Sequence, residues 1–140
     1  MSTINEIQDQ IIEDFSLLDD WMDRYQMIID SGNDLSPMPE KYKTPEHLIE
    51  GCQSRVWVAG TLTEDGRLQL MADSDAVIVK GIIALLLRVL SGQTPHDIAE
   101  ADLYFIDRLQ LTSHLSPTRS NGLLSMVRHI KLLATTYTQL

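Results

Sequence analysis

The sequence predicts an α+β fold, with a small antiparallel sheet in the middle of the chain and helices before and after it. Three observations support this prediction. Apolar residues recur at helical spacing near both ends, two central segments alternate apolar and polar residues, and a Glu-Asp-Gly turn separates those segments. A length of 140 residues and a hydrophobic content of 44% fit one domain, residues 1–140, with a single core.

The first part of the chain contains two predicted helices. The segment 3–17 places isoleucines at helical spacing, and Thr3 with Glu6 has the pattern of a capping box at its start. A second helix is predicted over about 20–30. We expect Gly32 to end this helix, because glycine readily adopts the left-handed conformation found after helices.

An extended loop and the predicted sheet follow. Several prolines favour an extended loop over 33–45, and a proline also suits the first position of a short helical turn over 45–50. Residues 55–63 and 67–73 alternate apolar and polar side chains, and Gly66 suits the turn between them. We therefore expect an antiparallel hairpin.

The second half of the chain is predicted to be helical. Asp73-Ser74-Asp75 is typical of a helix N-terminus, where carboxylates cap backbone amides and interact favourably with the helix dipole. The helix that follows, over about 75–91, is apolar on nearly all sides and should cross the core, with Gly92 ending it. Three further helices are predicted: a short one from Thr94, another over 102–109, and a long last one from Ser116.

The composition disfavours some classes of function. A net charge of −9 and a pI near 4.7 disfavour nucleic-acid binding, since the phosphates would be repelled. The most apolar stretch, 76–90, contains Lys80 and Arg88 and is too short and too charged to span a membrane. The N-terminus lacks the pattern of a signal peptide, so we expect a cytoplasmic protein, where a free thiol persists.

Cys52 is the only cysteine in the chain. A single thiol forms no internal disulfide and no multi-thiolate metal site, so we predict no metal and no cluster-scaffold role. Gly51 permits a sharp turn before the thiol, Gln53 and Ser54 can hydrogen-bond around the loop, and Arg55 places a cation nearby that favours the thiolate. On pattern alone, however, a free cysteine is more often a small buried apolar residue.

Three motifs resemble those of the SufE family, whose members accept sulfur from cysteine desulfurases. They occur in the family's order and spacing: GCQSRVW over 51–57, DSDAVIVKGIIA over 73–84, and LTSHLSPTRSNGL over 111–123. The resemblance covers nearly the whole chain. It implies a fold shared with the IscU-type cluster scaffolds, in which helices pack on one side of a small antiparallel sheet and the cysteine lies on a loop at one end.

The resemblance also implies a function and a set of partners. A pyridoxal-phosphate cysteine desulfurase of the SufS or CsdA kind would hold sulfur as a persulfide, and Cys52 would accept it. Delivery would then be to iron–sulfur cluster assembly, through a SufB-containing scaffold or another acceptor. Because the pyridoxal phosphate belongs to the desulfurase, we expect the chain to carry no cofactor and to be a carrier rather than an enzyme.

This transfer is similar to thiol–disulfide exchange, in which the attacking group is a thiolate. A thiol with an ordinary pKa of about 8.5 is only a few per cent ionised at neutral pH, so a nearby cation would help. Arg55 and Arg119 are the candidates, and we favour Arg119 because it lies in the third motif. We also expect the loop to hide Cys52 in the free protein and to expose it when the desulfurase docks.

Alternatives stay open at this stage. A regulatory binding module could activate the desulfurase on docking without carrying sulfur on Cys52. A cysteine hydrolase would need a base near Cys52, for which His114 is the candidate, although a structural role suits His114 better. Asp73 and Asp75 are candidates for partner contacts, with helix capping as the favoured explanation. The particular desulfurase, the downstream acceptor and the oligomeric state, a homodimer included, are left open.

Overall fold

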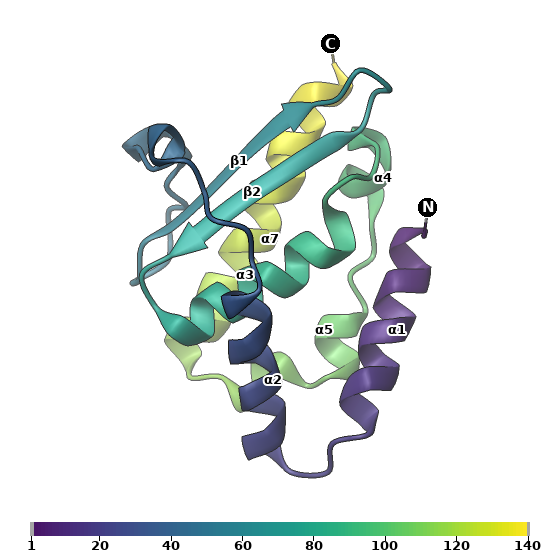
Figure 1. The fold of residues 1–140 in the computed structure, drawn as a ribbon, viewed down its shortest axis with the longest axis vertical. Helices are drawn as coiled ribbons and strands as arrows, with labels where there is room; N and C mark the ends of the chain where they lie inside the picture. Colours follow the sequence, from purple (N-terminus) through teal and green to yellow (C-terminus); the bar gives the residue numbers. More distant parts are fainter. Residues whose placement is uncertain (1, 140) are drawn as a thin grey trace.

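The computed structural model describes residues 2–139 and has the predicted α+β organisation (Figure 1). In this part of the chain one antiparallel hairpin is formed by two strands, β1 (Val56–Leu62) and β2 (Leu68–Ser74). The helices are α1 (Ile4–Ser16), α2 (Trp21–Asn33), α3 (Val77–Leu90), α4 (Pro95–Glu100), α5 (Phe105–Arg108), α6 (Leu111–His114) and α7 (Pro117–Thr138). Two short 3₁₀ turns, η1 (Glu40–Tyr42) and η2 (Pro45–His47), lie between α2 and β1.

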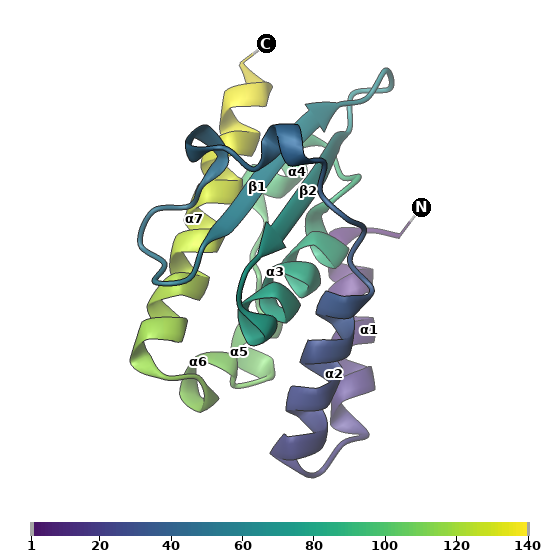
Figure 2. The same cartoon turned by 60° about the vertical axis from the view of Figure 1, so that its left-hand side comes forward.

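The hairpin lies between two layers. α7 runs behind the strands, and the segment 34–47, with η1 and η2, forms a front loop that passes before them (Figure 2). On the α7 side, the Tyr137 hydroxyl donates a hydrogen bond to the carbonyl oxygen of Gly60 at 3.0 Å. On the front-loop side, the Lys43 ammonium lies 5.9 Å from the centre of a Trp57 ring. Helices therefore cover one face of the sheet, and a loop covers the other.

α3 is the central helix of the core. It contacts α1, α2, α7 and β2, and most of its side chains are buried, as its apolar sequence predicted. It begins at Val77, after Ala76, and no side chain hydrogen-bonds to the first backbone amides of the helix. The prediction that Asp73 and Asp75 cap this helix is therefore wrong: Asp73 lies within β2, and both carboxylates have other partners.

Gly32 does not end the second helix, because α2 continues to Asn33. The reason is a close crossing of two helices. A Cβ on Gly32 would lie 2.8 Å from the backbone nitrogen of Gly81 in α3, and a Cβ on Gly81 would lie 2.1 Å from the carbonyl oxygen of Ile28 in α2. Both glycines therefore allow the backbones of α2 and α3 to touch.

The short helices between α3 and α7 agree only in part with the prediction. α4 begins after Thr94, whose hydroxyl accepts a hydrogen bond from the Asp97 amide at 3.2 Å. The helix expected over 102–109 is limited to α5, and α6 was not predicted. Gln110 separates α5 from α6 with a φ of 57°, a left-handed conformation that is uncommon outside glycine. Within residues 2–139, no helix is long and apolar enough to cross a membrane.

Candidate functional site

Cys52 lies on the loop that connects η2 to β1. The loop is closed at its base by a hydrogen bond from the Ile49 amide to the Val56 carbonyl oxygen at 2.8 Å. Gly51 has a φ of 89°, which is the sharp turn that the sequence predicted, and residues with side chains rarely adopt it. A Cβ on Gly51 would also lie 2.5 Å from the Ser125 Oγ, so the loop backbone packs directly against α7.

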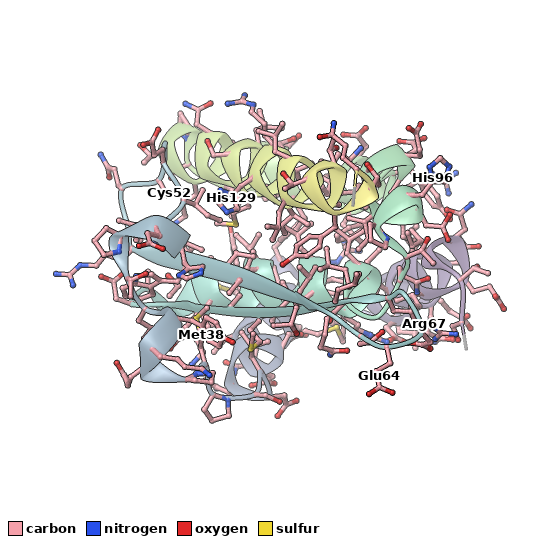
Figure 3. The ribbon with its side chains drawn as sticks, turned by 90° about the horizontal axis from the view of Figure 1, so that it is seen from above. Met38, Cys52, Glu64, Arg67, His96 and His129 are labelled. Atoms are coloured by element: carbon pink, nitrogen blue, oxygen red, sulfur yellow. The ribbon has the colours of Figure 1, made fainter. Side chains whose placement is uncertain are left out.

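The Cys52 side chain points into the layer between the hairpin and α7 (Figure 3). Its thiol donates a hydrogen bond to the carbonyl oxygen of Gly122, with 3.6 Å between sulfur and oxygen. The residue is half-buried, and it packs against the edge of the hydrophobic core. A Cβ on Gly122 would make an ordinary van der Waals contact with the Cys52 Sγ, at 3.5 Å, so the sulfur lies directly against this turn of α7.

A cavity of about 370 Å³ opens beside this thiol. Four residues that the sequence singled out line it, namely Cys52, Gln53, Ser54 and Arg119. Residues from α3, from α7 and from the turn before α7 complete the lining: Val79, Ser116, Thr118, Gly122 and Met126. Val79 and Met126 are buried, whereas Arg119 and Thr118 are exposed, so the cavity is apolar inside and polar at its rim.

Burial raises the pKa of the Cys52 thiol above its ordinary value. Desolvation has this effect because it disfavours the charged thiolate. The sequence indicated two opposing influences on the pKa of Cys52, a cation that would favour the thiolate and an apolar pocket that would disfavour it. In the free protein the effect of burial is the larger one, and Cys52 is a protonated thiol at neutral pH.

Arg55 is exposed and directed towards Asp75, which lies just before α3. Its Nε lies 3.9 Å from one carboxylate oxygen of Asp75, and its backbone amide donates to the other at 3.0 Å. Arg55 is not among the described residues that line the Cys52 cavity. Asp75 therefore anchors the far end of the Cys52 loop to the start of α3.

Asp73 joins three segments of the chain. One carboxylate oxygen lies 2.8 Å from the Nζ of Lys43 in the front loop, and the other lies 3.4 Å from the Nζ of Lys80 in α3. Burial alone would raise the pKa of Asp73, but the hydrogen bonds from Lys43 and from the Ser74 amide, together with the charge of Lys80, lower it overall. Asp73 thus ties the front loop and α3 to β2.

His114 makes a structural contact, which is the role that the sequence favoured for it. The ring of His114 stacks on Trp21 of α2, with 3.7 Å between ring centres, and no histidine is found among the described residues that line the Cys52 cavity. His129 was not singled out, yet it lies half-buried on α7 near the Cys52 loop (Figure 3). Burial lowers the pKa of His129, and the charge of His47 lowers it further.

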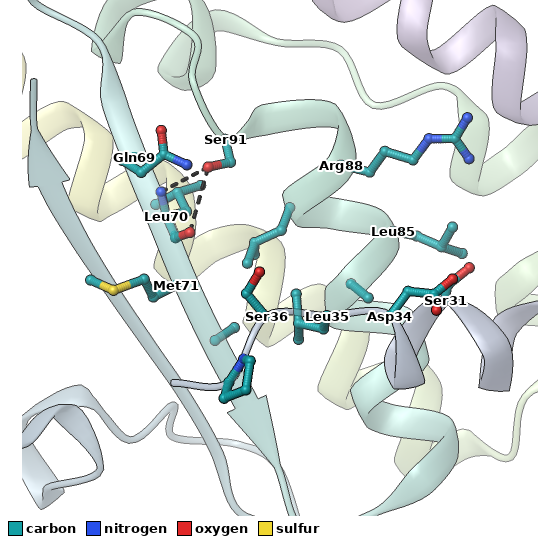
Figure 4. Close-up of a pocket in the computed structure, with 14 residues that line it drawn as sticks. Ser31, Asp34, Leu35, Ser36, Gln69, Leu70, Met71, Leu85, Arg88 and Ser91 are labelled. Atoms are coloured by element: carbon teal, nitrogen blue, oxygen red, sulfur yellow. Dashed lines mark hydrogen bonds between the residues drawn. The ribbon is translucent and has the colours of Figure 1, made fainter. Parts of the chain in front are cut away.

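A second cavity, of about 560 Å³, lies between the end of α2, β2 and α3 (Figure 4). The predicted site residues all fall within the described chain, and none of them lines this cavity. Its one arginine, Arg88, is directed away from β2 and lies 3.5 Å from the Asp14 carboxylate of α1. The Ser91 hydroxyl is likewise engaged, since it accepts a hydrogen bond from the Leu70 amide at 2.9 Å. Arg88 and Ser91 thus hold neighbouring elements together.

Sequence reasoning missed the residues of α7 on which the Cys52 loop rests. These are Gly122 and Ser125, three positions apart and therefore on the same face of the helix. Gly122 lies within the third motif, and a glycine inside a predicted helix was the available signal of a close contact. Nothing in the pattern identified the loop as the partner of that contact.

Three comparisons relate the chain to known proteins. A family model described as "SufE: Fe-S metabolism associated domain" matches residues 9–134. An uncharacterised SufE-like protein of Rhizobium meliloti (strain 1021) is 43% identical over 127 residues, which is 88% of this chain and 91% of that protein. The solution structure of a hypothetical protein from Thermus thermophilus superposes with a TM-score of 0.79 at 21% identity, covering 96% of this chain and 97% of the other. This last likeness shows a shared fold.

Proposed function

Because the chain belongs to the SufE family, whose domain is associated with iron–sulfur metabolism, we propose that it is a sulfur carrier. In this proposal a cysteine desulfurase of the SufS or CsdA kind donates the sulfur, and Cys52 accepts it. The carrier stimulates the desulfurase by relieving it of its persulfide. It then delivers the sulfur to iron–sulfur cluster assembly in the cytoplasm, through a SufB-containing scaffold or another acceptor.

The proposed transfer is one displacement at sulfur. The Cys52 thiol first loses its proton to solvent or to the partner. Its thiolate then attacks the outer sulfur of the desulfurase persulfide, forming a new S–S bond while the S–S bond of the donor breaks. The donor cysteine leaves as a thiolate, and Cys52 becomes a persulfide. No electrons are gained or lost overall, so the carrier requires no cofactor of its own, and the pyridoxal phosphate stays with the desulfurase.

The observation that carries the proposal is the setting of Cys52. The thiol lies on a glycine turn just before β1, beside a cavity whose rim holds Arg119. A guanidinium at this rim favours an anionic sulfur by charge. We therefore assign Arg119 as the residue that stabilises the thiolate and the persulfide once Cys52 leaves the apolar interior. The loop residues Gln53 and Ser54 line the same cavity and border the surface to which a desulfurase would bind.

The test is the intact mass of the protein after incubation with a cysteine desulfurase and cysteine. We expect wild type to gain the mass of one or more sulfur atoms, and Cys52→Ser to gain none. The same Cys52→Ser variant distinguishes a carrier from a regulatory module, because a carrier without its thiol cannot relieve the desulfurase and so loses stimulation. The absence of an adduct on wild type, with a desulfurase shown to be active, would refute the proposal, as would full stimulation by Cys52→Ser.

Arg128 provides a matched control for Arg119. Both arginines are exposed on α7, but Arg128 borders a neighbouring cavity with Glu46 and Glu50 and not the Cys52 cavity. We expect Arg119→Ala to slow sulfur loading about two- to fivefold, the range of an exposed charge interaction, and Arg128→Ala to leave the rate unchanged. Equal rates for both variants would remove Arg119 from the proposed site while leaving Cys52 in it.

A further inference from the structure

The Cys52 loop is fixed at both ends, whereas its middle is held by contacts with α7. At one end the Ile49 amide donates to the Val56 carbonyl oxygen, and at the other the Arg55 amide donates to the Asp75 carboxylate. Between these points the described contacts with α7 are the packing of Gly51 on Ser125 and the hydrogen bond from Cys52. Of the interactions described in the middle of the loop, the hydrogen bond from Cys52 is thus the one that is directional. It is also the one that is lost when the chemical state of a side chain changes.

That hydrogen bond requires a proton on the sulfur. A thiol is a weak donor, and the Gly122 carbonyl oxygen can only accept. Once a second sulfur is added, the Sγ of Cys52 is bonded to its own Cβ and to the new sulfur, and it carries no hydrogen. The Cys52 Sγ and the Gly122 carbonyl oxygen, 3.6 Å apart, can then both only accept, so no hydrogen bond forms between them.

The added sulfur also changes the electrostatics of the contact. A persulfide ionises more readily than a thiol, so its outer sulfur carries negative charge, and the carbonyl oxygen of Gly122 carries partial negative charge. The outer sulfur projects about 2 Å beyond Sγ, which enlarges the side chain at a packed contact. The nearest favourable charge on the cavity lining is the exposed guanidinium of Arg119 at the rim. Both effects draw the loaded side chain away from the Gly122 carbonyl oxygen and towards the exposed rim of the cavity.

We propose that the hydrogen bond from Cys52 to Gly122 is a latch that senses sulfur loading. It holds residues 50–53 on α7 while Cys52 is an unloaded thiol, and the addition of sulfur releases them. This inference rests on the proposed function, since sulfur is taken to load on Cys52. Its consequence is a carrier that withdraws its thiol when empty and presents its sulfur when full.

The latch is weak enough to let the desulfurase reach the empty carrier. A single hydrogen bond contributes a net factor of roughly two to ten to an equilibrium, so an unloaded loop still opens for a substantial part of the time. The thiolate form opens it as well, because it also lacks the proton. Loading therefore changes the populations of a loop that already moves.

The test is amide hydrogen exchange of the peptide 48–55, followed by mass spectrometry on protein that has met no desulfurase. Cys52→Ser keeps a hydroxyl donor at the position of the thiol, whereas Cys52→Ala has no donor, so the two form a matched pair. Wild type treated with methyl methanethiosulfonate carries a second sulfur on Cys52 and no S–H. We expect Cys52→Ser to exchange like wild type, and both Cys52→Ala and the treated protein to exchange roughly two- to tenfold faster.

Peptides from α3 serve as the internal control for the fold, and their exchange should be the same in all four samples. Protection of 48–55 in Cys52→Ala equal to that of wild type would overturn the latch. Exchange of Cys52→Ser as fast as that of Cys52→Ala would also overturn it, as would unchanged protection in the treated protein. These outcomes are independent of the sulfur-loading experiment, so a carrier without a latch and a latch without carrier activity give different results.

Discussion

At the scale of single residues, the chemistry of Cys52 is set by what surrounds it. The sequence identified the thiol and its glycine turn, because composition and local pattern reveal a lone cysteine and a residue that can adopt positive φ. It also identified Arg119 through the family resemblance, and the structure places that residue on the same cavity as the thiol. The contact with Gly122 could not be predicted, because Cys52 and Gly122 are 70 positions apart and only the fold brings them together.

The raised pKa of Cys52 leads to a prediction on pH dependence. We expect the rate of alkylation by iodoacetamide to rise with a midpoint at higher pH in the native protein than in the chain unfolded in urea, whose thiol has an ordinary pKa of about 8.5. The native state keeps its proton longer than the unfolded state does. The thiol's contribution to stability is therefore complete below the unfolded pKa and is lost as pH rises through the folded pKa.

The measurement is a rate profile between about pH 7 and 10, with Cys52→Ser as the blank for reaction at other residues. The alkaline loss of stability should be smaller in Cys52→Ser than in wild type, since a hydroxyl does not ionise in this range. A native midpoint at or below that of the unfolded chain would show that a cation, rather than burial, governs the resting thiol.

At the scale of elements, most of the secondary structure follows from local pattern. The capping box of α1, the hairpin turn and the Thr94 cap of α4 are close to where the sequence predicted them, because each depends on residues three or four positions apart. The errors at Gly32 and at Asp73-Ser74-Asp75 have another origin. In both places a residue type that commonly marks a helix end is instead used for a contact between distant elements, and such contacts leave no local signal.

Two helical glycines give a matched pair that tests this distinction. Gly81→Ala would place a Cβ 2.1 Å from the Ile28 carbonyl oxygen, so we expect a loss of about 3 kcal/mol or more in the free energy of unfolding. Gly122→Ala would meet only the Cys52 Sγ, at an ordinary 3.5 Å, and should gain up to about 1 kcal/mol because alanine favours the helix.

Urea denaturation followed by circular dichroism provides the measurement for both glycine variants. Their opposite signs distinguish a glycine that allows two backbones to touch from one where a methyl group would fit beside a thiol. A Gly81→Ala protein as stable as wild type would mean that α2 and α3 can separate at little cost, contrary to the close crossing. A strong destabilisation by Gly122→Ala would mean that the loop packs on α7 more tightly than the distances indicate.

At the scale of the whole molecule, the chain is organised around α3, and the candidate site lies where three separate segments meet. The Cys52 loop, the start of α7 and the first turn of α3 all contribute to the cavity lining. The motifs predicted each of these segments, since each carries its own cluster of polar and small residues. The sequence pattern did not predict how these three segments assemble, because the relative placement of elements depends on packing across the core.

Two tryptophans on different elements provide a last prediction, that residues 1–140 unfold as one cooperative domain. Trp21 in α2 stacks on His114 of α6, and Trp57 in β1 lies beneath Lys43 of the front loop. Since α3 contacts both α2 and β2, loss of either region should expose the same core. We therefore expect Trp21→Phe and Trp57→Phe variants, each with one remaining tryptophan, to give fluorescence transitions that coincide with the loss of helix in urea. The free energy of unfolding should fall by about 1–3 kcal/mol per molar urea.

Each variant is compared with its own circular dichroism curve, which removes any effect of the substitution on stability. A Trp57 transition at lower urea than the loss of helix would divide the chain into a separable hairpin and a helical body, and the cavity beside Cys52 would then lie at the boundary between them.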